Sequence, residues 1–300
     1  HDGAGNTIAT NNGIRRFAYS VTGRYVTFID NGVVKARYSY DGHGQRVVVQ
    51  RYTNSGAVNG WIIFSYNPAG QLVHEQEYRP DGSLWETRSH IWLGALPLAM
   101  VAQVYPLTGG VNNAEFYYVL PDHQMTPRVL LDSKEREVWR WQSDAFGHGQ
   151  ANPNPDGDSR MLTYNLRLPG QYYDAESGHY YNYFRDYAPS KGQYIQSDPI
   201  GLAGGMNTYG YADASPTTKT DPLGLATYIC TRPLGGSPST WAPPVFNHTY
   251  VCVGGDPRNM TCGSTTASVE ELWPNIKKGG PGAPTTSDKD YYNPDACEKR

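Results

Sequence analysis

Residues 37–46 read RYSYDGHGQR and residues 63–72 read IFSYNPAGQL, and these two segments decide the fold class. In each, a strand-like run ends at a tyrosine, Tyr40 or Tyr66, which is followed by Asp or Asn, a glycine, and then Arg or Leu. The two tyrosines are 26 positions apart, and residues 77–84 form a looser third copy. Short runs joined by such turns at intervals of about 20–30 residues predict a repetitive antiparallel sheet, because Gly and Asn accept the positive φ of tight turns. We expect the tyrosine of each copy to pack across its hairpin.

The composition favours a mainly β chain with many turns. The 300 residues include 24 Tyr, 33 Gly and 22 Pro, and only 18% are charged. Tyr favours pleated strands, whereas Gly and Pro interrupt them at turns. Disordered chains have few aromatic residues and a high net charge, so this composition does not fit a disordered chain. The formal net charge of -3 gives no electrostatic reason to bind nucleic acid or anionic lipid, and no apolar run reaches the roughly 18 residues of a membrane helix.

The cysteines divide the chain. Residues 1–229 contain none, and all four lie in the last 71 residues, at Cys230, Cys252, Cys262 and Cys297. This break predicts a domain boundary at about residues 225–230. The chain begins with His rather than Met and shows no signal-peptide pattern there, so we interpret it as a piece of a longer protein.

Downstream segments resemble a known family. Residues 116–128, FYYVLPDHQMTPR, resemble the DHxxTPR segment of Rhs cores, and residues 138–147, VWRWQSDAFG, are similar to their W…D-x-F-G segment. The densest match consists of residues 168–174 (LPGQYYD), 181–187 (YNYFRDY), 192–202 (GQYIQSDPIGL) and 221–225 (DPLGL). It resembles the Rhs repeat-associated core signature, and the first repeats resemble the tyrosine-aspartate (YD) repeats of Rhs and teneurin-like proteins. The resemblance covers roughly residues 35–225.

The resemblance implies a polymorphic toxin whose hairpins wind into a hollow β-cocoon around a C-terminal toxic domain. On this basis we expect residues 1–150 to form part of a YD-repeat shell and residues 151–225 to be a core plug that cleaves itself. Residues 226–300 would be a variable, cysteine-containing tip with an α+β or irregular fold, and truncation of this tip is one interpretation. The expected fold class is therefore mainly β, with repetitive antiparallel hairpins.

The pentad Asp-Pro-x-Gly-Leu occurs twice, at residues 198–202 and 221–225, with its aspartates 23 positions apart. Proline biases the preceding Asp toward an extended conformation, and glycine permits a sharp turn. By itself the pattern is typical of structural turns. Two carboxylates brought together would instead share one proton, so that the charged one activates a water and the protonated one donates to an amide, as in aspartic proteases.

In Rhs cores, similar pentads are associated with self-cleavage after the second one. The resemblance therefore implies that Asp198 and Asp221 form a catalytic dyad and that the bond between Leu225 and Ala226 is cut. We expect Arg185 to position or neutralise one of the aspartates. The chain would then be an intramolecular aspartic-type self-protease, with no cofactor and no bound metal.

Two other features have simpler interpretations. His123 lies in a Pro-Asp-His turn, where we expect a structural hydrogen bond. The tyrosine-rich residues 172–187 are expected to contribute packing.

Three interpretations compete for the tip. Four cysteines in a small exported domain favour disulfides. A Cys/His hydrolase would pair His248, in a strand predicted over residues 246–253, with Cys262 or with Cys297, and residues 293–298 would open a helix that activates Cys297. A zinc site is the third interpretation, although the cysteines lack paired C-x-x-C spacing.

The leading hypothesis is a secreted effector of interbacterial competition, held in the bacterial cytoplasm before export and delivered by a secretion spike such as that of type VI secretion. Its partners would be a cognate immunity protein and the delivery machinery. The alternative is an uncleaved surface or wall-associated YD-repeat protein with a structural or adhesive role.

Overall fold

The computed structural model describes residues 1–108, 110, 112–225, 227–233, 247–253, 261–264 and 297–299. The chain forms two compact units. The first contains residues 1–197 and 209–224, and the second contains residues 198–208 and 225–300. The predicted boundaries at residues 150 and 225 remain predictions, because these units do not follow the same division.

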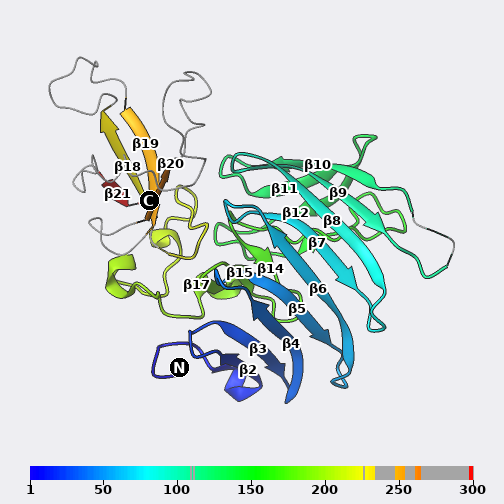
Figure 1. The fold of residues 1–300 in the computed structure, drawn as a ribbon, viewed down its shortest axis with the longest axis horizontal. Coiled ribbons are helices and arrows are strands. Elements are labelled where there is room, and N and C mark those ends of the chain that lie inside the picture. Colours follow the sequence, from blue (N-terminus) through cyan, green and yellow to red (C-terminus); the bar gives the residue numbers. More distant parts are fainter. Residues whose placement is uncertain are drawn as a thin grey trace. The chain divides into compact units, whose positions relative to one another are not determined.

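The first unit is built on a 13-stranded antiparallel sheet whose strands are ordered as in the chain (Figure 1). The mainly β fold of repeated antiparallel hairpins is therefore confirmed. Its strands are β1 (Ala9–Thr10), β2 (Arg15–Tyr19), β3 (Tyr25–Asp30), β4 (Val33–Tyr40), β5 (Arg46–Tyr52), β6 (Val58–Tyr66), β7 (Leu72–Tyr78), β8 (Leu84–Leu93), β9 (Leu96–Val104), β10 (Glu115–Pro121), β11 (Pro127–Leu131), β12 (Glu137–Trp141) and β13 (Ala151–Asn152).

One turn design recurs along this sheet. Between β4 and β5, the Asp41 N–H donates to the Gln45 carbonyl at 2.9 Å, and the Gly44 N–H donates back to the Asp41 carbonyl at 3.0 Å. The Asp41 carboxylate also accepts from the backbone N–H of Gln45 at 2.8 Å. Gly44 has φ +78°, a left-handed conformation that glycine adopts without steric strain. Met125 and Glu135 occupy the same position in other turns, with φ 65° and 62°.

The repeated tyrosines fasten neighbouring strands by hydrogen bonds. The Tyr40 hydroxyl donates to the Tyr25 carbonyl and the Tyr66 hydroxyl to the Arg46 carbonyl, both at 2.7 Å. Trp92, a further 26 positions along, donates its indole N–H to the Leu72 carbonyl at 2.8 Å. The three acceptors are the first residues of β3, β5 and β7. Each repeat therefore fixes the start of a preceding strand.

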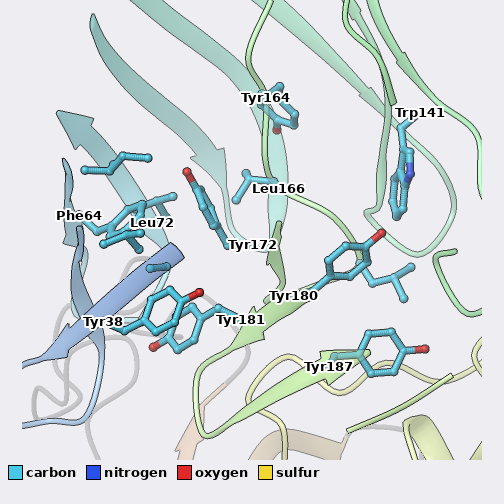
Figure 2. Packing of buried hydrophobic residues seen from close by; sticks show 14 of the residues in the cluster. Tyr38, Phe64, Leu72, Trp141, Tyr164, Leu166, Tyr172, Tyr180, Tyr181 and Tyr187 are labelled. Atoms are coloured by element: carbon cyan, nitrogen blue, oxygen red, sulfur yellow. The ribbon is translucent and has the colours of Figure 1, made fainter. Parts of the chain in front are cut away.

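A small second sheet packs on one face of the large one. It consists of β14 (Tyr172–Tyr173), β15 (Tyr180–Asn182), β16 (Arg185–Ala188) and β17 (Gln193–Tyr194). Tyr172 meets Phe64 of the large sheet edge to face, with ring centroids 5.0 Å apart (Figure 2). Tyr180 similarly meets Trp141. The tyrosine-rich segment thus contributes packing, and Figure 2 shows it among the buried residues of the core.

Helices are short in the described part of the chain, where every helical turn is of the 3-10 type. The first unit contains η1 (Asn11–Gly13), η2 (Pro189–Lys191) and η4 (Ala212–Ala214), and the second contains η3 (Gly201–Gly204). Within the ranges that the structure describes, no helix has the length and apolar character needed to cross a membrane.

The second unit contains a four-stranded antiparallel sheet in the order β20-β19-β18-β21. Its strands are β18 (Thr227–Pro233), β19 (Asn247–Val253), β20 (Thr261–Ser264) and β21 (Cys297–Lys299). The strand predicted over residues 246–253 corresponds to β19. The helix predicted to begin near Cys297 was wrong, because Cys297 begins β21 and pairs with β18.

Candidate functional site

Asp221, the aspartate of the second pentad, is buried in the first unit between two side chains of the small sheet. Its Oδ2 accepts a hydrogen bond from the Tyr194 hydroxyl at 2.8 Å and lies 3.4 Å from Nη2 of Arg185. The Arg185 side chain is itself only 2% exposed. A buried carboxylate held by an arginine and a phenol is fixed in orientation, which is one property required of a catalytic base.

The pentad is bound along its length by the turn between β15 and β16. Asn182 donates its side-chain N–H to the Asp221 carbonyl at 2.8 Å, and the Phe184 N–H donates to the Leu223 carbonyl at 3.1 Å. Arg185 uses a second nitrogen, Nε, to donate to the Gly224 carbonyl at 2.6 Å. One arginine therefore contacts both the Asp221 carboxylate and the backbone just before Leu225.

A close backbone approach supports the pentad from the other side. A Cβ atom added to Gly170 would overlap the carbonyl oxygen of Pro222, and φ at this glycine is +81°. Both the close approach and the positive φ select glycine, because it has no side chain to clash with Pro222 and adopts a left-handed φ without strain. The Leu-Pro-Gly segment at residues 168–170 is thus shaped to hold the second pentad.

Tyr194 is a neutral hydrogen-bond donor at this site. Burial raises its pKa well above the ordinary value, the nearby charge of Asp221 raises it further, and Arg185 only partly opposes them. The Arg185 guanidinium lies over the Tyr194 ring, 3.8 Å from its centroid. The phenol therefore keeps its proton and donates it to the hydrogen bond with Asp221.

Asp198, the aspartate of the first pentad, belongs to the second unit. It is buried, and its N–H donates to the Thr208 carbonyl at 2.8 Å. Its Oδ1 accepts from the Ile200 N–H at 3.0 Å, and the Gly201 N–H donates to its carbonyl at 2.9 Å. These bonds form a tight turn at the start of η3, as the Asp-Pro-x-Gly pattern predicts.

The structure brings together two of the predicted site residues, Asp221 and Arg185. It adds Tyr194 and Asn182, which the sequence analysis did not single out. Tyr194 was hidden among 24 tyrosines, and no periodic pattern distinguishes it from the packing residues. His123 lies outside this cluster, with Nε2 3.2 Å from the Thr217 carbonyl oxygen, consistent with the structural role expected of it.

The candidate residues of the tip are placed by strand register. His248 of β19 lies opposite Arg232, Cys262 lies opposite Cys252, and Cys297 lies opposite Cys230. Neither Cys262 nor Cys297 is thus paired with His248. The side chains of these strands and Ala226 lie outside the described part of the chain. The hydrolase therefore stays a hypothesis.

Among the described side chains, no group of three or more His, Cys, Asp or Glu residues forms a candidate metal site.

A second buried carboxylate–arginine pair lies on the large sheet. Glu75 Oε2 lies 3.2 Å from Nη2 of Arg88 and accepts from the Tyr172 hydroxyl at 2.7 Å. Glu75 Oε1 lies 2.8 Å from Nε2 of His90. Burial alone would raise the pKa of Glu75, but the Arg88 charge and the bonds from His90 and Tyr172 lower it to about 2.

A cavity of 320 Å³ lies between the large sheet and residues 162–176, and its lining includes Glu77 and Tyr172. Glu176 is among the residues that line this cavity. Burial, followed by the charge of Asp174, raises the pKa of Glu176 to about 8. This carboxyl is therefore largely protonated at neutral pH.

The comparisons with known proteins agree with this architecture. No family model matches the chain. The chain is 33% identical over 235 residues to the toxin protein Tse5 of Pseudomonas aeruginosa, a match that covers 70% of this chain and 17% of Tse5. It is also 33% identical over 192 residues to the probable deoxyribonuclease RhsB of Dickeya dadantii, covering 63% of this chain and 12% of RhsB. The chain belongs to the Rhs-type polymorphic toxin family.

The fold of the Rhs chain is shared with a solved structure. The crystal structure of TcdB2-TccC3 without its hypervariable C-terminal region aligns with a TM-score of 0.60 and 19% identity. The alignment covers 74% of this chain and 10% of that one. The Rhs chain thus spans less than a fifth of the length of these relatives.

Proposed function

We propose that this Rhs chain hydrolyses its own peptide bond between Leu225 and Ala226 and so releases residues 226–300 as a toxin. The observation that carries the proposal is the double role of Arg185. Its Nη2 lies 3.4 Å from the Asp221 carboxylate, while its Nε holds the Gly224 carbonyl one residue before the cut. The charged base and the segment to be cut are thereby held by one rigid guanidinium.

In the proposed reaction, Asp221 is the base and is kept ionised by Arg185. It removes a proton from a water whose oxygen attacks the carbonyl carbon of Leu225. Asp198, in its protonated form, donates its proton to the nitrogen of Ala226 as the C–N bond breaks. The part given to Asp198 rests on its place in the matching pentad.

The relatives support a released toxin of variable activity. One is called a toxin and another a deoxyribonuclease, and TccC3 has a C-terminal region described as hypervariable. We propose that residues 226–300 are the part that differs between family members. A cognate immunity protein and a delivery apparatus that carries the toxin into competing bacteria would be its partners.

Intact-mass analysis of the expressed chain tests the proposal. We expect one fragment ending at Leu225 and a second beginning at Ala226. Asp221→Asn and Asp198→Asn should each leave a single full-length mass, because loss of either group slows hydrolysis on the order of a thousandfold or more. Asp41→Asn is the matched control and should cleave normally, because Asn67 occupies the same turn position in the next repeat. Normal cleavage in both dyad variants would refute the mechanism. An uncut wild type with native circular dichroism would favour a structural YD-repeat protein.

A further inference from the structure

The four-stranded sheet of the second unit carries all four cysteines of the chain. In the antiparallel ladder, Cys252 of β19 is the direct partner of Cys262 of β20. Cys230 of β18 is the direct partner of Cys297 of β21. Two independent strand pairs thus place cysteine opposite cysteine.

All four positions share one face of the sheet. Cys230 lies opposite Tyr250, and Cys252 follows Tyr250 by two residues on β19. Residues two apart on a strand belong to the same face, and directly opposed residues also share a face. Cys262 and Cys297 therefore join the face of Cys252 and Cys230.

Only one of the three possible connectivities suits this register. Directly opposed residues have Cα atoms about 4.5–5.5 Å apart, within the range of about 4.4–6.8 Å found in disulfides. Pairing Cys230 with Cys262, or Cys252 with Cys297, would span two strand spacings, roughly 9.6 Å. Pairing Cys262 with Cys297 would span three spacings, roughly 14 Å. Cα atoms more than about 7 Å apart are not bridged without moving the backbone.

We propose that Cys230–Cys297 and Cys252–Cys262 are disulfides. Each forms when two thiols lose two protons and two electrons to a disulfide oxidant, either a protein dithiol oxidase or oxidised glutathione. A thiolate attacks the oxidant to form a mixed disulfide, and the second cysteine thiolate displaces the reduced oxidant. We therefore expect the disulfides to form in an oxidising compartment and the four cysteines to remain reduced thiols in a reducing cytoplasm.

The bonds would secure the two outer strands. β20 has four residues and β21 has three, shorter than the usual strand of about five or six residues. A bond from Cys297 to Cys230 ties the last strand to the strand that follows the proposed cut. This inference goes beyond the proposed cleavage and does not depend on it.

Disulfide mapping of the whole chain tests the connectivity. The chain is equilibrated with a glutathione redox buffer, quenched with N-ethylmaleimide, and digested without reduction by trypsin and chymotrypsin together. These enzymes separate the cysteines by cutting at sites that include Trp241, Arg258 and Lys277. We expect linked peptides that join Cys230 to Cys297 and Cys252 to Cys262, and an intact mass about 4 Da below that of the reduced chain.

Two other results would overturn the proposal. Four maleimide-labelled cysteines after oxidation would exclude both bonds, and a linked pair such as Cys230–Cys252 would refute the register argument. The double variant Cys252→Ser with Cys262→Ser provides a check that does not depend on those two residues. It should keep the Cys230–Cys297 link, and labelling of both remaining thiols would contradict the proposal.

Discussion

Two of the buried carboxylate–arginine pairs of the first unit, Glu75–Arg88 and Asp221–Arg185, have similar contacts but different surroundings. Each carboxylate accepts a hydrogen bond from a tyrosine hydroxyl and forms an ion pair with an arginine. The partners Arg88 and His90 of Glu75 are strand residues of the large sheet. The arginine of Asp221 instead reaches onward to the backbone of a connecting segment, at Gly224.

Burial and an ion pair therefore do not identify a catalytic carboxylate by themselves. Glu75 has hydrogen-bonding partners on both oxygens, which suits a purely structural role. Asp221 is distinguished by an arginine that also holds the segment next to the proposed cut. Variants that separate stability from cleavage make this comparison testable.

Arg88→Met is expected to have the largest effect on stability. It leaves Glu75 buried without its countercharge, and breaking a buried pair in this way costs about 3–5 kcal/mol. Urea unfolding followed by tryptophan fluorescence measures the loss. At low temperature, where the variant stays folded, its rate of self-cleavage should equal that of the wild type. A large fall in that rate would contradict a purely structural role for the Glu75 pair.

Replacing each of the two tyrosine donors by phenylalanine should give intermediate effects, on stability at one site and on cleavage at the other. Tyr172→Phe and Tyr194→Phe each remove one hydroxyl from a buried carboxylate, and such bonds contribute about 1.5–3 kcal/mol. Tyr172→Phe should lower the free energy of unfolding and leave the cleavage rate unchanged. Tyr194→Phe should slow cleavage by roughly tenfold or more, measured in molecules confirmed as folded by circular dichroism. Equal cleavage rates in the two variants would remove the distinction between the sites.

Glu176 provides a third kind of carboxyl, whose effect on stability depends on pH. Its pKa of about 8 in the folded chain lies above the ordinary 4.5, so its contribution to stability is full below about pH 4.5 and is lost as the pH rises to about 8. Glu75 has the opposite shift, and its contribution is lost only as the pH falls from about 4.5 toward 2. We expect the urea midpoint of Glu176→Gln to rise relative to that of the wild type as the pH increases from about 5 to about 8, because only the wild type loses the contribution of Glu176. A constant difference between the two midpoints over this pH range would contradict the role given to Glu176.

The repeated hairpins were predictable because turn chemistry is local. Asp41 and Gly44 specify their loop through bonds within five residues, and residues 67–71 repeat the pattern. Which face of β8 is buried was not predictable in the same way. Its large apolar residues Trp85 and Ile91 are 41% and 39% exposed, while its two charged residues, Glu86 and Arg88, are buried. Alternation identifies two faces, but the partners that bury a charged face come from distant residues such as Tyr172.

The candidate site was predicted in part for the same reason. The pentads are visible as a sequence repeat, and Arg185 was predicted to position or neutralise one of their aspartates. Tyr194 and Asn182 join the site through contacts with residues 27 and 39 positions away. No local pattern encodes such contacts, so they required the folded structure.

The strict order of the large sheet has a kinetic consequence. Neighbouring strands are consecutive in the chain, so each hairpin closes a short loop and can form soon after it leaves the ribosome. Bonds such as that from Arg46 to Asp186, which span 140 positions, form only after the small sheet has docked. Asp221 comes later still in the chain. The order of synthesis therefore ensures that the residues proposed to cut the chain are made only after every strand of the large sheet.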